Sequence, residues 1–142
     1  MEQNYKNHRR FHAPFHFVLA PLLLVYLVYT IVRIAQEPSI DRAAMILLAL
    51  VLFGILGLSR TNALRVQDRV IRLEEQLRYT RVLSADLAAN AANLPINQII
   101  ALRFASDEEL PQLIERALQN QFSKPIEIKR SVQNWRADDL RV

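Results

Sequence analysis

The sequence predicts an all-α fold: a two-helix transmembrane hairpin whose second span extends into a cytoplasmic helix, followed by a small cytoplasmic bundle of about three short helices. Three observations lead to this prediction. Two long runs without a formal charge lie within the first 60 residues, a short link separates them, and the charged remainder places apolar residues at helical spacing. No stretch alternates between apolar and polar residues as a half-buried strand does, so we expect no sheet.

The first apolar run covers residues 11–32. At about 1.5 Å per residue such a helix is roughly 33 Å long, which is enough to cross a bilayer. A cleaved signal peptide is the alternative, because Lys6, Arg9 and Arg10 precede the run as the basic n-region of a signal would. No small-x-small cleavage site lies around residues 33–36, which favours a retained span.

The second apolar run, residues 43–59, is about 25 Å long as a helix and reaches across a bilayer if Arg42 and Arg60 extend outward along their apolar stems. The charges of the link, residues 33–42, cancel, whereas basic residues gather before the first span and after the second. By the positive-inside rule both termini face the cytoplasm. We therefore expect a multi-pass protein of a bacterial inner membrane.

These boundaries divide the chain into four parts. They are a cytoplasmic or interfacial N-terminus at residues 1–12, the hairpin at 13–60 with spans at about 13–32 and 43–59 and a periplasmic turn at 33–42, a cytoplasmic amphipathic helix and linker at 61–93, and a cytoplasmic helical domain at 94–142.

Apolar residues after the second span recur at spacings of three and four, which indicates one face of a helix. They are Ala63, Val66, Val70, Leu73 and Leu77. Leu64, Ile71 and Val82 fall on another side, so this helix is expected to pack on two faces or to form a short coiled coil. Whether it continues through Ser84 stays open, because residues 84–93 suit both a fraying helix end and a linker.

Three short amphipathic helices are expected in the last part of the chain. The first covers Ile96–Phe104. The second opens with a capping box at Ser106–Glu109 and carries Leu113 on its apolar face. The third opens at Ser123-Lys124-Pro125, with proline in its first turn, and its face includes Trp135 as a core or docking residue.

Three segments make the chain resemble a family of uncharacterised bacterial membrane proteins that is known only as a domain of unknown function. The segments are Gln3-Asn4-Tyr5-Lys6-Asn7-His8, the run Ala-Leu-Arg-Phe-Ala-Ser-Asp-Glu-Glu-Leu-Pro at residues 101–111, and Asn134-Trp135 near the end. The resemblance extends over nearly the whole chain. It implies a membrane protein, and it implies no activity, cofactor or catalytic residue.

The composition excludes several kinds of site. The chain has no cysteine, which excludes thiol catalysis and thiolate-bound metals, and its two glycines, Gly54 and Gly57, cannot form a glycine-rich phosphate loop. The glycines are expected instead to let the two spans pack closely. No Asp, Glu, Lys or Arg lies inside either apolar run, which argues against transport. We expect no enzyme, no cofactor and no small-molecule substrate.

His8, His12 and His16 are candidate metal or haem ligands, because residues four apart share one face of a helix. Pro14 interrupts such a helix, and the neighbouring basic and aromatic residues favour a place at the lipid headgroups. Contact with anionic lipid is expected for the basic residues nearest the membrane, which are Lys6, Arg9, Arg10, Arg60 and Arg65.

The leading functional hypothesis is a non-enzymatic accessory or scaffolding subunit of a membrane complex, or a homo-oligomer. Its predicted interaction residues are Val66, Val70, Leu73, Leu77, Leu113 and Trp135. The alternative is a membrane-tethered regulator whose helical module binds a soluble protein or nucleic acid. Residues 94–142 hold seven basic and seven acidic side chains, which disfavours nucleic acid. A metal- or haem-binding membrane protein is a third hypothesis, based on the histidines alone.

Overall fold

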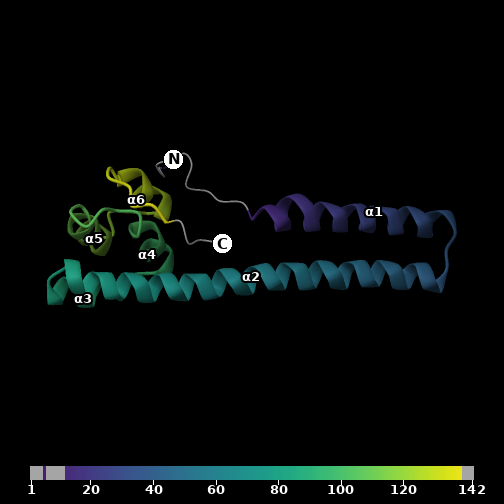
Figure 1. The fold of residues 1–142 in the computed structure, drawn as a ribbon, viewed down its shortest axis with the longest axis horizontal. Helices are drawn as coiled ribbons and strands as arrows, with labels where there is room; N and C mark the ends of the chain where they lie inside the picture. Colours follow the sequence, from purple (N-terminus) through teal and green to yellow (C-terminus); the bar gives the residue numbers. More distant parts are fainter. Residues whose placement is uncertain (1–4, 6–11, 139–142) are drawn as a thin grey trace. The chain divides into compact units, whose positions relative to one another are not determined.

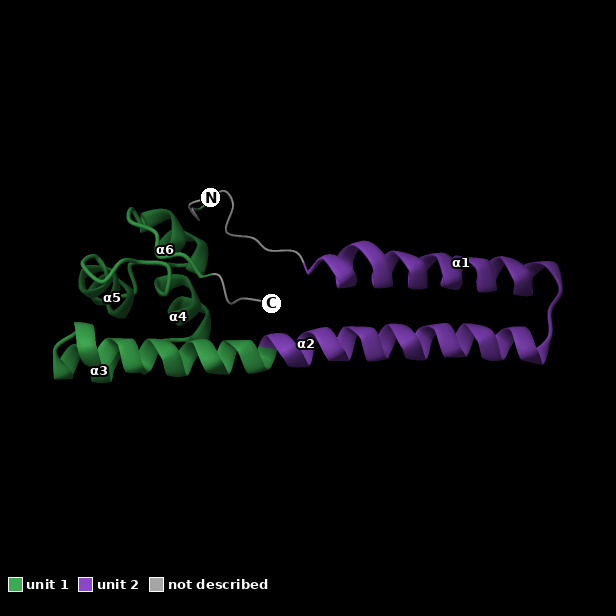
Figure 2. Cartoon of the chain, in the orientation of Figure 1, with its two compact units in different colours: residues 1–10, 65–142 green, residues 11–64 purple. Residues whose placement is uncertain are grey.

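The computed structural model of the chain describes residue 5 and residues 12–138 (Figure 1). These residues are all-helical and include no strand, as the sequence predicts. They fall into two compact units, one within residues 11–64 and one formed by residues 65–142 together with residues 1–10 (Figure 2). We call the first the apolar unit and the second the C-terminal unit.

The apolar unit contains a short π-helix η1 (Pro14–Leu19), helix α1 (Ala20–Gln36) and the first part of helix α2 (Ile40–Val82). The π turn has a local cause. Pro21, in the first turn of α1, has no N–H, and its ring would clash with a carbonyl of a regular preceding turn. The backbone widens there, and the N–H of Ala20 donates to the carbonyl of Phe15, five residues back.

The link between α1 and α2 is shorter than the predicted turn at residues 33–42. Only residues 37–39 lie outside the two helices, because the flanking residues continue the helical hydrogen bonding. The Arg42 guanidinium closes the link: it donates to the carbonyl of Arg33 at 3.1 Å and to the carbonyl of Glu37, and it pairs with the Glu37 carboxylate. Hydrogen bonding to Arg42 lowers the pKa of the Glu37 carboxyl below its usual value.

Both long helices are apolar enough to cross a membrane, and their apolar side chains are exposed. Only 6% of the most apolar window of each helix is buried, and Val25 and Leu58 are 67% and 63% exposed. The buried residues of the apolar unit are Thr30 on α1 and Ala49 on α2. A water-soluble protein usually buries helices as apolar as these in its core. In this unit the same side chains lie on the surface.

The C-terminal unit contains the second part of α2 and four short helices: α3 (Ala85–Ala91), α4 (Ile96–Leu102), α5 (Leu110–Leu118) and α6 (Pro125–Ser131). Helix α2 does not continue through Ser84. It ends at Val82, and the Ser84 hydroxyl accepts the N–H of Leu87 at 3.4 Å as the N-cap of α3. The unit has its own core, to which α2 and all four short helices contribute.

The three predicted C-terminal helices are present, with differences at their ends. The Glu109 carboxylate accepts the N–H of Ser106 at 3.2 Å, as a capping box requires, but α5 begins only at Leu110. Helix α6 begins at Pro125, as expected. Trp135 lies beyond α6, where it forms an isolated antiparallel bridge with Ala105.

Candidate functional site

The part of α2 within the C-terminal unit has an outward face that is strongly apolar. Val66, Val70, Leu73 and Leu77, which we call the outer stripe, are 61%, 46%, 60% and 62% exposed. Among the described residues of this unit, every large apolar side chain in the exposed class belongs to the outer stripe. An aligned row of exposed aliphatic side chains is typical of an interaction surface.

The opposite side of the same helix segment, which we call the inner face, is buried against the unit's own helices. It consists of Ile71, Glu75, Arg78, Tyr79 and Val82. Glu75 and Arg78 are 4% and 8% exposed, and Tyr79, at 1%, belongs to the core. Burial raises the pKa of the Tyr79 hydroxyl, and the Glu75 carboxylate raises it further. The prediction that this helix packs on two faces is therefore confirmed for the inner face.

Arg78 is the centre of an ion-pair network in which Arg78 and Glu75 are buried and Asp107 is exposed. Its Nε donates to Asp107 Oδ1 at 2.7 Å, its Nη1 to Glu75 Oε2 at 3.2 Å and its Nη2 to the carbonyl oxygen of Ala105 at 2.7 Å. The side chain thus satisfies two carboxylates and one carbonyl at once. The network fastens α2 to the segment between α4 and α5, and its geometry is that of a structural clamp.

A polar cavity of about 290 Å³ lies beside this network. Its lining residues are Ile71, Glu74, Glu75, Arg103, Arg136, Ala137 and Asp138. The charges of the lining pair with one another: Arg103 Nη2 lies 3.0 Å from Asp138 Oδ2, and Arg136 Nη1 lies 3.4 Å from Glu75 Oε1. The first pair holds the segment after α6 against the end of α4, and the second holds it against α2, so both have a structural role.

Burial raises the pKa of the Glu75 carboxyl, and the nearby arginines, Arg78 foremost, oppose this effect. The carboxyl lies beyond the apolar run of α2, which ends at Ser59. Folding of the unit therefore disfavours the ionised form of Glu75. The protonation of this carboxyl is in consequence coupled to the stability of the unit.

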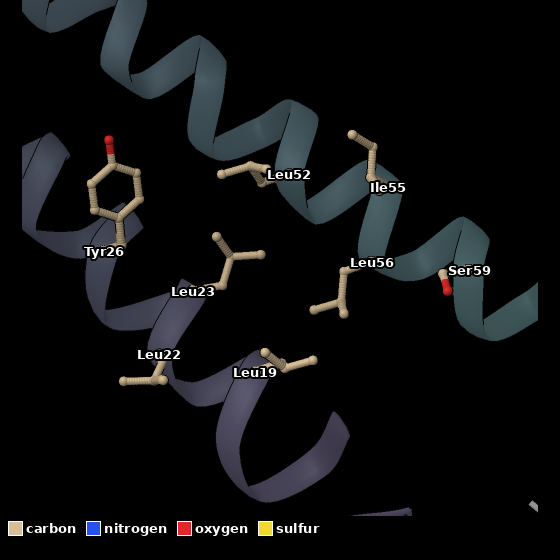
Figure 3. Close-up of a pocket in the computed structure, with 8 residues that line it drawn as sticks. All are labelled: Leu19, Leu22, Leu23, Tyr26, Leu52, Ile55, Leu56 and Ser59. Atoms are coloured by element: carbon tan, nitrogen blue, oxygen red, sulfur yellow. The ribbon is translucent and has the colours of Figure 1, made fainter. Parts of the chain in front are cut away.

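A groove of about 610 Å³ lies between α1 and α2 within the apolar unit (Figure 3). Leu23 and Tyr26 on α1 face Leu52 and Leu56 on α2, and the lining is almost wholly apolar. The groove offers almost no polar group to orient a ligand, so its lining gives no sign of a specific binding site.

Gly54 and Gly57 do not bring the two helices of the apolar unit together. A Cβ atom added at either glycine would meet no other atom within 4 Å, so both lie beside open space. The buried small residues of this unit are Thr30 and Ala49 instead. Thr30 satisfies its own hydroxyl, which donates to the carbonyl of Leu27 at 2.8 Å.

The predicted metal and lipid residues are only partly covered by the structure. His8, Lys6, Arg9 and Arg10 lie outside the described residues. Of the other two histidines, His16 Nδ1 lies 3.0 Å from the carbonyl oxygen of His12, and no group of three or more potential metal ligands occurs in the part of the chain that is described.

The two remaining basic residues take different positions. The guanidinium of Arg60 lies over the Phe15 ring, 5.8 Å from its centroid, within the apolar unit. Arg65 is exposed and borders a shallow hollow with Asp68, Arg69, Arg72 and Ile96.

Two of the six predicted interaction residues pack within their own unit, one in its core and one against it. Leu113 is 4% exposed, and the Trp135 ring packs on Phe104 with 4.9 Å between ring centroids. Leu113 lies inside the core of its own unit, and Trp135 is partly buried against that core, so both side chains serve the fold. The candidate surface therefore reduces to the outer stripe.

Sequence reasoning missed the ion-pair network around Arg78. A signal for it exists, because Glu75 and Arg78 fall on the same side of the helix as Ile71, Tyr79 and Val82. A charged residue on a face that becomes buried needs an ion-pair or hydrogen-bond partner, because burial of an unpaired charge costs free energy. The pairing that i,i+4 spacing suggests, Glu74 with Arg78, gives way to Glu75 and to Asp107.

Of three comparisons with known proteins, one finds a match. No curated protein and no solved structure matches the chain. The profile of a family of unknown function (DUF6526) matches residues 1–142, the whole length of the chain. The resemblance recognised in the sequence is thus confirmed, and the protein belongs to this family of unknown function.

Proposed function

We propose that the protein is an integral inner-membrane protein of a bacterium that acts as a non-enzymatic scaffolding or accessory subunit. A transmembrane hairpin, α1 with the first part of α2, anchors the chain, and the C-terminal unit stands in the cytoplasm. The observation that carries this proposal is that both units expose apolar surface, in two different ways: all around the apolar unit and along one stripe of the C-terminal unit.

The membrane anchor follows from exposure combined with length. A soluble protein that contained helices as apolar as these would bury them, yet only 6% of each apolar window is buried. Lipid supplies the missing environment, because each helix satisfies its own backbone hydrogen bonds. The positive-inside rule adds the orientation, with both termini in the cytoplasm.

The scaffolding role follows from the outer stripe. Helices α3 to α6 contribute to a core on the other side of α2, so this stripe adds nothing to the fold of the C-terminal unit. Apolar side chains kept in this arrangement at the aqueous surface support a protein partner.

The orientation can be tested directly, because the chain has no cysteine of its own. We would introduce Ile40→Cys, at an 88% exposed position beside the link, and Gln112→Cys, at an exposed position on α5. A membrane-impermeant thiol reagent should label the first variant in intact cells and the second only after the membrane is opened. Labelling of both in intact cells, or the reverse pattern, would overturn the topology.

The scaffolding role is tested by tagging the C-terminus, extracting the protein in a mild detergent and determining what accompanies it in constant stoichiometry. A defined assembly of membrane proteins, or of several copies, is expected from the wild type. Leu73→Glu should release that assembly, whereas Gln112→Glu, the matched charge on α5, should not. A wild-type protein that emerges as a single chain contradicts the proposal.

One observation favours a second candidate, a membrane-tethered regulator whose module binds a soluble protein. The C-terminal unit has a core of its own and an ion-pair network, as a self-sufficient module does. A fragment from Arg60 onward that is folded and monomeric, and that captures one soluble protein, would support the regulator over the membrane subunit.

A further inference from the structure

We propose that a second copy of this chain covers the outer stripe, through a parallel two-stranded coiled coil between the two α2 helices. This inference rests on the proposed membrane anchor and names the partner that the scaffolding role leaves open. Three features of the described residues carry it: the spacing of the stripe, the direction of α2 and the charges beside the stripe.

The spacing of the outer stripe is that of a coiled-coil seam. Val66, Val70, Leu73 and Leu77 follow one another at intervals of four, three and four, so Val66 and Leu73 take d positions and Val70 and Leu77 take a positions. The inner face, with Ile71, Glu75, Arg78 and Tyr79, falls at positions b, c and f, on the far side of the helix. The unit's own packing thus leaves the seam open to a partner.

The direction of the pair follows from the continuity of α2. The helix runs unbroken from Ile40 to Val82, through the apolar run that ends at Ser59. Two copies with the same topology in one membrane therefore present parallel α2 helices. The stripe begins at Val66, after the apolar run has ended at Ser59, so it lies outside the proposed membrane span.

The charges beside the stripe suit a parallel pair of identical helices. Arg69 takes a g position and Glu74 the following e position, and both side chains are exposed. In a parallel pair the g residue of one helix meets the next e residue of its partner. Arg69 of each copy therefore meets Glu74 of the other, which gives two attractive pairs and no repulsive one.

A seam of two heptads is too short to hold two helices together in dilute solution, but anchoring in a membrane favours their association. Confinement of both copies to one bilayer in a fixed orientation makes their association nearly intramolecular, with a high effective concentration. Burial of four aliphatic side chains from each copy then stabilises the pair at little further cost in orientational entropy.

The first test is cross-linking of single cysteines in native membranes, which the absence of natural cysteines makes clean. Val66→Cys, Val70→Cys, Leu73→Cys and Leu77→Cys should each form a disulfide between two identical chains. Arg65→Cys, an exposed residue one position from Val66 and off the seam, should not. Cross-linking at all four positions indicates a parallel register, whereas an antiparallel pair would cross-link only near its centre.

The second test exchanges charges at the flanks and identifies the partner as a second copy. Arg69→Glu places two glutamates opposite each other and Glu74→Arg places two arginines opposite each other, so each variant should weaken self-association several-fold. The double variant should restore it. The two single variants mixed in one membrane should pair with each other in preference to themselves.

The outcomes separate this inference from the proposed function. Cross-links to a different protein, or equal pairing of all charge variants, would overturn the second copy while the membrane scaffold stands. Failure of the topology test with Ile40→Cys and Gln112→Cys would remove the scaffold itself. Complete absence of disulfides on the seam, with the topology confirmed, would overturn the coiled coil alone.

Discussion

The two faces of α2 in the C-terminal unit both depart from the usual pattern of an amphipathic helix. The inner face, covered by the unit's own helices, buries charges: Glu75 and Arg78 are 4% and 8% exposed. The outer face carries the aliphatic outer stripe, with Leu73 at 60% exposed and Leu77 at 62%. A helix that served only the fold of one chain would have its apolar side chains inside and its charges outside.

The difference teaches which part of the sequence serves the fold and which serves association. The charges on the inner face are compensated by partners within the chain, Asp107 and the carbonyl of Ala105 among them. The aliphatic side chains of the outer stripe are not covered by any other part of the described structure. Changes on the inner face should therefore affect stability, and changes on the outer face should affect assembly.

Arg78→Met should have the largest effect on stability. It leaves the Glu75 carboxylate with its weaker partner Arg136 and leaves the Ala105 carbonyl without its donor, so we expect a loss of about 3–5 kcal/mol in the free energy of unfolding. Trp135, the single tryptophan, packs on Phe104 in this unit, so its fluorescence during denaturant unfolding reports the change. Arg81→Met, at an exposed position on the same helix, should stay within about 0.5 kcal/mol of the wild type.

Ile71→Ala should come next. Ile71 is 5% exposed on the inner face and borders the polar cavity, where water can fill part of the space that the side chain vacates. We expect a loss of about 2 kcal/mol in the free energy of unfolding, at the low end of the range for replacing a buried isoleucine by alanine. The same fluorescence measurement checks it, and an unchanged unfolding midpoint would show that the inner face contributes little to the fold.

Glu75→Gln should change how stability depends on pH. Burial raises the pKa of Glu75, so between its ordinary value of 4.5 and the raised value the folded state binds more protons than the unfolded state. The contribution of Glu75 to the stability of the wild type therefore falls as pH rises through this window, and the variant lacks this contribution. The stability of the variant relative to wild type should grow with pH and then level off. A relative stability that falls with pH would mean that the nearby arginines outweigh burial and lower the pKa of Glu75.

Leu73→Ala should have the smallest effect on the fold. In detergent micelles that hold one chain each, the exposed side chain has little to lose, so unfolding should shift by no more than about 0.5 kcal/mol. Ile71→Ala, two residues away on the inner face, is the matched control. A loss as large as that of Ile71→Ala would place Leu73 in the fold of the single chain.

The sequence alone predicts most helices but only part of their packing. The apolar runs, the start of α6 at Pro125 and the apolar face of α5 follow from local signals such as charge-free length, proline position and periodicity. The Arg78 network does not, because Asp107 lies 29 residues along the chain and periodicity counts only apolar positions. The burial of Ala49 and the open space beside Gly54 do not follow from local signals either, because a small side chain in an apolar run does not show by itself which side of the helix is covered.

The candidate surface was also only partly predictable. Six residues were expected to interact, and a helical pattern does not tell a stripe that closes the protein's own core from one that is left exposed. Leu113 is a core residue and Trp135 is partly buried against the core, whereas Val66 and Leu77 stay exposed. What separates the two groups is tertiary structure, namely which faces α3 to α6 already cover.

The most direct test of the division between the two faces is one variant measured twice. Leu73→Glu would be compared with wild type in lipid bilayers for the number of chains per assembly, and in single-chain micelles for unfolding through Trp135 fluorescence. We expect two chains in the wild type and one in the variant, with unchanged unfolding. A variant that still pairs, or one that unfolds the C-terminal unit, would contradict the assignment of the outer stripe to association between copies.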